Sequence, residues 1–146
     1  MLKGISPLIS PELLTTLHRM GHGDEIVLAD VHFPGESLNR KVVRADGIRM
    51  ANLLNAILPL FELDSYVPNP LFMMLAEAGD SLDLELESSY RSVIDNHCRN
   101  SSPIERIDRS AFYDRTRQAF AVVMTGETSQ YGNIILKKGV TPLEQN

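Results

Sequence analysis

The sequence predicts an α/β protein: a three-layer α/β/α sandwich around a mostly parallel, mixed sheet in a single domain. Short apolar runs that are typical of strands alternate along the chain with segments whose apolar residues recur at helical spacing. The length of 146 residues lies in the range of one domain. Hydrophobic residues make up 43% of the chain, which is enough to form a buried core. We therefore expect one domain over residues 1–146, with 143–146 as a frayed tail.

The first third of the chain predicts a helix, two strands and a second helix. Ser10 can cap a helix that has Pro11 at its first position, and Gly21 lies where a left-handed C-cap would end it. Apolar residues recur at helical spacing from Met50 until Pro59 ends the pattern. Between these helices, two short apolar runs are typical of strands covered on both faces, namely residues 25–30 and 41–45.

The rest of the chain predicts five strands and two helices. A helix is indicated by the spacing of apolar residues over 82–94, and Ser110 can cap another that runs to Gln118. The predicted strands are residues 63–67, 71–76, 104–107, 120–125 and 133–137.

Composition excludes several classes of function. The net charge of −5 and the pI near 5.3 leave no excess of positive charge for phosphates, so we expect no nucleic-acid partner. The longest apolar runs, 56–61 and 71–76, are far shorter than the roughly 20 residues that span a bilayer, and no membrane association is expected. Cys98 is the only cysteine and no signal-like segment opens the chain, which favours a cytoplasmic location.

The stretch RMGHGDEIVLADVHF, residues 19–33, carries several groups with useful chemistry. Asp30 and His32 follow the first predicted strand, and ligands of open α/β sheets bind at the carboxyl ends of strands. His22 precedes the same strand, so a six-residue strand at about 3.3 Å per residue separates it from Asp30 by roughly 20 Å. The two can meet only if the loop folds back or if two subunits come together.

Each of these residues also has a structural explanation. The glycines on both sides of His22 can serve a helix C-cap and a tight turn, which leaves the histidine as a solvated turn residue. Asp30 can act as a cap, and His32 as a surface residue. His22, Asp24, Asp30 and His32 are together possible metal ligands, but their spacing matches no known closed metal site, so no metal is expected.

Six segments carry a resemblance to a known family: ISPLISPELL, MGHGDEIVLAD-x-HFP, VxRADG, PLFELDSY, AFYDRTRQAF and TGETSQYGNIILKKGV. In these motifs the chain resembles the L-fucose mutarotase family, which is related to the D-ribose pyranases. The resemblance extends from Met1 to about Pro142, although the segment 96–102 is not matched.

The resemblance implies an isomerase that interconverts the α and β anomers of L-fucose without a metal or an organic cofactor. It implies that His22 is the proton donor. The substrate-binding residues that it implies are Asp30, Arg109, Tyr131, Gly132 and Asn133. It further implies a homo-oligomer, a closed ring of ten chains, with sites at or near the subunit contacts.

Anomer exchange fits these residue types. Ring opening removes a proton from the anomeric hydroxyl and delivers one to the ring oxygen, and histidine, with an ordinary pKa of about 6.5, suits both transfers. Tyr131 is a possible second proton carrier, although a phenol with an ordinary pKa of about 10 is a reluctant base.

Other interpretations of the same residues stay open. Tyr131 could be an ordinary aromatic on an edge strand, and Arg109 could pair with Asp108 or Asp114 on the surface. Pyranose/furanose exchange on D-ribose, a non-catalytic sugar-binding subunit and a metal-dependent hydrolase are the competing functions.

Overall fold

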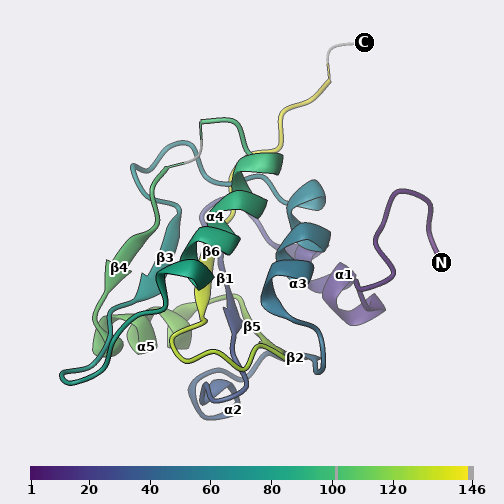
Figure 1. Cartoon of the computed structure of the whole chain (residues 1–146). Helices are drawn as coiled ribbons and strands as arrows, with labels where there is room; N and C mark the ends of the chain where they lie inside the picture. The colour runs from purple at the N-terminus through teal and green to yellow at the C-terminus, as the bar shows by residue number, and fades with distance from the viewer. Residues whose placement is uncertain (101, 145–146) are drawn as a thin grey trace.

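The structure is a computed structural model that describes residues 1–100 and 102–144 (Figure 1). The helices are α1 (Pro11–Arg19), α2 (Gly35–Leu38), α3 (Met50–Ile57), α4 (Leu84–His97) and α5 (Arg109–Gln118), with the short 3-10 helix η1 (Leu58–Leu60). The strands are β1 (Glu25–Ala29), β2 (Val42–Ala45), β3 (Leu71–Met74), β4 (Glu105–Ile107), β5 (Ala121–Thr125) and β6 (Ile134–Lys137). Of the predicted frayed tail, residues 145–146 lie outside the described residues, while Leu143 and Glu144 are exposed and belong to no element.

The strands form one six-stranded sheet in the order β2-β5-β1-β6-β3-β4. Neighbouring strands are parallel except at β6, which is antiparallel to both β1 and β3. The predicted mixed, mostly parallel sheet is therefore confirmed. The carboxyl ends of β1 to β5 all lie at one edge of the sheet, together with the amino end of β6.

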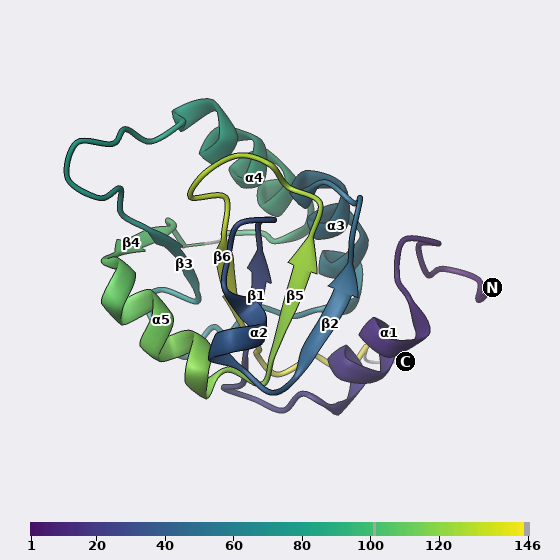
Figure 2. The ribbon, with the colours of Figure 1, turned by 90° about the horizontal axis from the view of Figure 1, so that it is seen from below.

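Helices cover both faces of the sheet, which confirms the predicted three layers. In the view of Figure 2, α3 and α4 lie on one side of the strands and α2 and α5 on the other. A cluster of buried apolar residues lies on each face of the sheet, and the side chains of β1 contribute alternately to the two. Ile26 and Leu28 pack on the side of α3 and α4, while Val27 and Ala29 pack on the side of α5. Within the described part of the chain, no helix is both long and apolar enough to cross a membrane.

The predicted end of the first helix is wrong at Gly21. The predicted capping by Ser10 is confirmed, but α1 ends at Arg19 with Met20 in an extended conformation, and Gly21 is not among the residues with positive φ. The Asp24 carboxylate instead accepts a hydrogen bond from the Gly21 N–H at 2.8 Å, and Gly23 supplies the positive φ of +88°. A side-chain turn thus replaces the expected glycine cap.

Two further predictions fail for local reasons. The strand expected over 63–67 is reduced to a single bridge between Leu63 and Lys138, because the Asp64 carboxylate accepts a hydrogen bond from the Tyr66 N–H and turns the chain.

Helix α5 is capped by Asp108 and not by Ser110, since the Asp108 side chain accepts a hydrogen bond from the Ala111 N–H at 2.7 Å. The four-residue helix α2 was not predicted.

Candidate functional site

A cavity of about 190 Å³ opens at the edge of the sheet where β1 to β5 end. Four of the five predicted substrate-binding residues line it, because they follow β1 and β4 or precede β6 at this edge. The full lining is Asp30, His32, Phe33, Pro34, Met74, Glu77, Arg109, Tyr113, Gln130, Tyr131 and Asn133. The sheet therefore brings together groups that lie about 100 residues apart in the sequence.

Asp30 is the buried centre of this group. It is 2% exposed, and its two carboxylate oxygens accept the backbone N–H groups of His32 at 3.0 Å and Gly132 at 3.1 Å. Burial raises the pKa of Asp30 above its ordinary value, although these two hydrogen bonds oppose the rise. Asp30 is thus a fixed acceptor whose position depends on the turn that carries Gly132.

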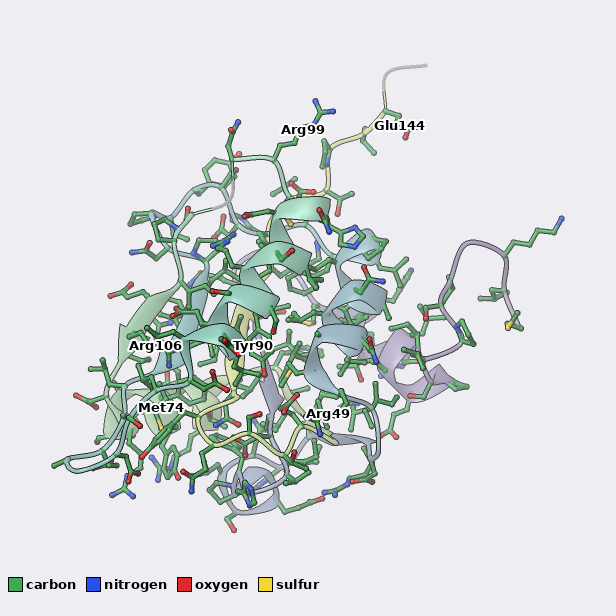
Figure 3. The ribbon with its side chains drawn as sticks, viewed as in Figure 1. Arg49, Met74, Tyr90, Arg99, Arg106 and Glu144 are labelled. Atoms are coloured by element: carbon green, nitrogen blue, oxygen red, sulfur yellow. The ribbon has the colours of Figure 1, made fainter. Side chains whose placement is uncertain are left out.

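Tyr90 of α4 stabilises the turn before β6 through a hydrogen bond. This side chain is fully buried and reaches from α4 toward the sheet (Figure 3), where its hydroxyl donates to the Gly132 carbonyl at 2.8 Å. A Cβ atom on Gly132 would lie 2.9 Å from the Ser129 carbonyl oxygen, so this position accepts only glycine without rearrangement. Tyr131 has a left-handed φ of +57°. Asn133 completes the turn and accepts the Asp30 N–H through Oδ1 at 2.7 Å, which leaves its amide NH₂ group for a ligand.

Carboxylates from the loop between β3 and α4 hold the two remaining cavity groups. Arg109 Nε lies 3.0 Å from Glu77 Oε1, so Arg109 does not pair with Asp108 or Asp114. The Tyr131 hydroxyl donates to Asp80 at 2.5 Å, and this hydrogen bond raises the pKa of Tyr131. At neutral pH the phenol therefore keeps its proton. The loop starts from a firmly anchored strand end, since Arg106 donates to the Met74 carbonyl at 2.6 Å (Figure 3).

His22 lies at the opposite edge of the sheet. Its loop is tied to the end of β6, because the Gly23 N–H donates to the Lys138 carbonyl and the Lys138 N–H to the Asp24 carbonyl, each at 2.8 Å. The five residues of β1 separate this loop from Asp30, or roughly 16 Å at about 3.3 Å per residue. As expected from the sequence, His22 and Asp30 lie at opposite ends of β1, and His22 is not among the residues that line the cavity.

The surroundings of His22 are specific. Its Nε2 atom lies 3.1 Å from Asp64 Oδ1, and its ring packs against Tyr66 with the centroids 5.1 Å apart. The Asp64 side chain is 2% exposed, whereas that of His22 is 45% exposed. His22 is therefore half open to an approaching molecule while one of its nitrogens is fixed.

The four residues considered as metal ligands are divided between the two edges of the sheet. Asp24 lies with His22 and binds the Gly21 N–H, while His32 lines the cavity near Asp30. Among the described residues, no three His, Cys, Asp or Glu side chains gather in a way that could hold a metal ion.

Sequence reasoning missed several residues that shape the two regions. Asp64 belongs to the motif PLFELDSY, but the strand predicted there hid its role as a turn former and histidine partner. Glu77 and Asp80 gave no signal, because they lie in a loop without periodicity. Tyr90 was expected only as an apolar residue of the helix over 82–94, and its contact with Gly132 was missed.

Comparison with known proteins places these features in context. Residues 3–141 match the sequence profile of the RbsD / FucU transport protein family. The L-fucose mutarotase of Glaesserella parasuis serovar 5 (strain SH0165) is 60% identical over 143 residues, which cover 98% of each chain. The L-fucose mutarotase of Histophilus somni (strain 2336) is 58% identical over 144 residues, or 99% of this chain and 100% of that protein.

Solved structures show the same fold. The crystal structure of the fucose mutarotase in complex with L-fucose from Streptococcus pneumoniae has a TM-score of 0.92 and 47% identity, covering 97% of this chain and 100% of that one. Bacillus subtilis RbsD complexed with D-ribose has a TM-score of 0.74 at 22% identity, with 97% and 100% covered, and that likeness concerns the fold alone.

Proposed function

This chain belongs to the RbsD / FucU family, and on that premise we propose that it is an isomerase that interconverts the α and β anomers of L-fucose. The observation that carries the proposal is the convergence of Asp30, Arg109, Tyr131 and Asn133 on one cavity. It is supported by 56–60% identity to relatives named L-fucose mutarotase and by the likeness to a fucose mutarotase solved with L-fucose.

The cavity offers what a small hydroxylated ring requires. Its volume of about 190 Å³ lies below the range of about 300–1,000 Å³ that is typical for drug-sized ligands. Asp30 provides carboxylate acceptors, while the Asn133 amide and the Arg109 guanidinium provide donors for sugar oxygens. Gly132 lets the backbone come close to the ligand.

The reaction needs two proton transfers and no redox change. One proton leaves the anomeric hydroxyl, the bond between C1 and the ring oxygen breaks as the aldehyde forms, and the ring oxygen gains a proton. After rotation about the C1–C2 bond, the reverse steps close the ring on the other face. We assign the proton donor to His22 and the second carrier to Tyr131, with no metal or organic cofactor.

A site shared between two copies of the chain would bring His22, which lies at the opposite edge of the sheet, to the cavity of a neighbouring copy. We propose a homo-oligomer, a closed ring of ten chains, in which His22 of one copy faces the cavity of another. The remaining expectations from the sequence, a single domain over 1–146 and a cytoplasmic location, are part of the same proposal.

Saturation-transfer NMR tests the function on the purified protein with L-fucose and D-ribose side by side. We expect the protein to accelerate α/β exchange of L-fucose in the presence of a chelator. L-fucose binding without acceleration would favour a non-catalytic sugar-binding subunit. Acceleration confined to pyranose/furanose exchange of D-ribose would assign the related activity instead.

Tyr131→Phe tests the second proton carrier. Water can reach this partly exposed position and can carry the proton when the phenol hydroxyl is removed. We therefore expect the exchange rate at saturating L-fucose to fall only about tenfold, less than the loss of 10²- to 10⁴-fold that is typical of a positioned acid or base. Tyr113→Phe makes the same change in another tyrosine of the cavity and is expected to slow the exchange less, because Tyr113 has no part in the proposed proton transfers. An unaltered rate in Tyr131→Phe would assign the second transfer to water.

A further inference from the structure

We propose that Asp64 is the positioning residue of His22: its carboxylate accepts a hydrogen bond from Nε2 and leaves Nδ1 as the nitrogen that exchanges protons with the sugar. The inference rests on the proposed function, in which His22 is the proton donor. It adds a residue to the catalytic unit and names the reacting atom of the imidazole.

The geometry makes Asp64 a rigid support. Its backbone N–H donates to the Lys137 carbonyl at 3.0 Å, which fixes residue 64 against the end of β6. Its Oδ1 atom accepts the Tyr66 N–H at 3.0 Å as well as His22 Nε2 at 3.1 Å. With its side chain 2% exposed, this carboxylate has no freedom to turn away from the ring.

Hydrogen-bond chemistry then assigns the two ring nitrogens. An ionised carboxylate only accepts hydrogen bonds, so the His22 nitrogen that faces Asp64 carries a proton. In the neutral imidazole the other nitrogen, Nδ1, therefore holds the free electron pair. No hydrogen bond from another described residue reaches Nδ1, and the side chain is 45% exposed. Nδ1 is thus available to a sugar held by another copy of the chain.

The charge of Asp64 suits this role. Burial alone would raise its pKa, but hydrogen bonds from the Tyr66 backbone and the His22 ring, with the charges of His22 and Lys137, outweigh burial and hold the pKa of Asp64 below its ordinary value. The group is ionised at neutral pH. When Nδ1 takes the anomeric proton as the ring opens, the carboxylate stabilises the imidazolium cation. The imidazolium then donates that proton back from Nδ1 as the ring closes, and the proton on Nε2 stays in place throughout.

The Asp64→Asn variant isolates the charge. Because the Tyr66 N–H requires an acceptor, the amide is expected to keep its oxygen toward Tyr66 and His22 and to preserve the local fold. We expect kcat for L-fucose exchange to fall about tenfold, because the hydrogen bond to His22 loses its charge. KM stays unchanged, because Asp64 does not touch the sugar. Asp114→Asn, in an exposed pair with Arg117, is the matched control and is expected to behave like the unmodified protein.

A double-mutant cycle separates positioning from general support of the fold. If Asp64 acts through His22, Asp64→Asn causes no further loss of exchange in the His22→Gln background. An equal loss in both backgrounds, or no loss in either, would overturn the inference.

A spectroscopic measurement tests the inference without relying on activity. Solid-state NMR of protein labelled with ¹⁵N-histidine, with the His22 signals identified by their absence in His22→Gln, reports which ring nitrogen carries the proton. We expect protonated Nε2 and bare Nδ1 in the unmodified protein at a pH where the ring is neutral, and signals of both tautomers in Asp64→Leu. Protonated Nδ1 in the unmodified protein would overturn the inference even if the enzyme is active. A protein with the expected tautomer but no fucose exchange would contradict the proposed function alone.

Discussion

Replacing His22 with glutamine is expected to slow α/β exchange of L-fucose by about 10²- to 10⁴-fold, the usual contribution of a positioned acid or base. Glutamine can still form hydrogen bonds, but it cannot take up and release a proton near neutral pH. The fold should survive, because the His22 side chain is 45% exposed and Asp64 keeps its bond to the Tyr66 N–H. Saturation-transfer NMR measures the exchange, and calorimetric titration with L-fucose measures binding, which should persist.

His97→Gln is the matched control for this variant. His97 is an exposed histidine on α4 that is also held through Nε2, at 2.8 Å from Asn55 Oδ1. We expect normal exchange in this protein. Normal exchange in His22→Gln as well would remove His22 from the mechanism, and loss of fucose binding together with exchange would make it a binding residue.

The second large effect is expected for Arg109→Met. This change keeps the apolar stem and removes the guanidinium group, which Glu77 holds at the wall of the cavity. Losing one or two charge-assisted hydrogen bonds to the sugar, at about 1.5–3 kcal/mol in total, should lower kcat/KM by about 10- to 100-fold, mainly through a higher KM.

Arg117→Met is the control for the loss of positive charge. Arg117 also lies on α5, but it forms an exposed pair with Asp114 and does not line the cavity. Its removal should change kcat/KM less than twofold, because Arg117 has no contact with the cavity and its exposed ion pair contributes little. A similar loss in both variants would point to the net charge of α5 instead of a contact with the sugar.

The elements with strong periodicity could be predicted from the sequence. The first helix was placed by Ser10 and Pro11, and β1 and β5 by short apolar runs, because local capping and burial on both faces determine these segments. Residues 63–67 misled the same reasoning. Apolar residues at both ends of this stretch suggest a strand, but the hydrogen bond from the Tyr66 N–H to Asp64 turns the chain.

The candidate site was only partly accessible to sequence reasoning. The position of Asp30 at the end of a strand follows from the pattern alone, whereas Arg109 and Tyr131 were identified through the family resemblance. The loop carboxylates Glu77 and Asp80 have no periodic signal, since their role depends on contacts made across the sheet edge. The distance between His22 and Asp30 could be estimated from the strand length. No local sequence pattern, however, indicates the surface of a second copy that would bring its cavity to His22.

The central claim is that the site combines His22 of one copy with the cavity of another, and subunit mixing tests it most directly. The variants His22→Gln and Arg109→Met, each with its own affinity tag, are co-expressed, and oligomers that carry both tags are purified. If the site is shared, a randomly mixed oligomer regains about one quarter of the kcat/KM of the unmodified protein. One site in four then combines an intact His22 from an Arg109→Met copy with an intact cavity from a His22→Gln copy. If His22 and Arg109 of the same chain formed the site, mixing would yield no activity beyond the average of the two variants, and the claim would be contradicted.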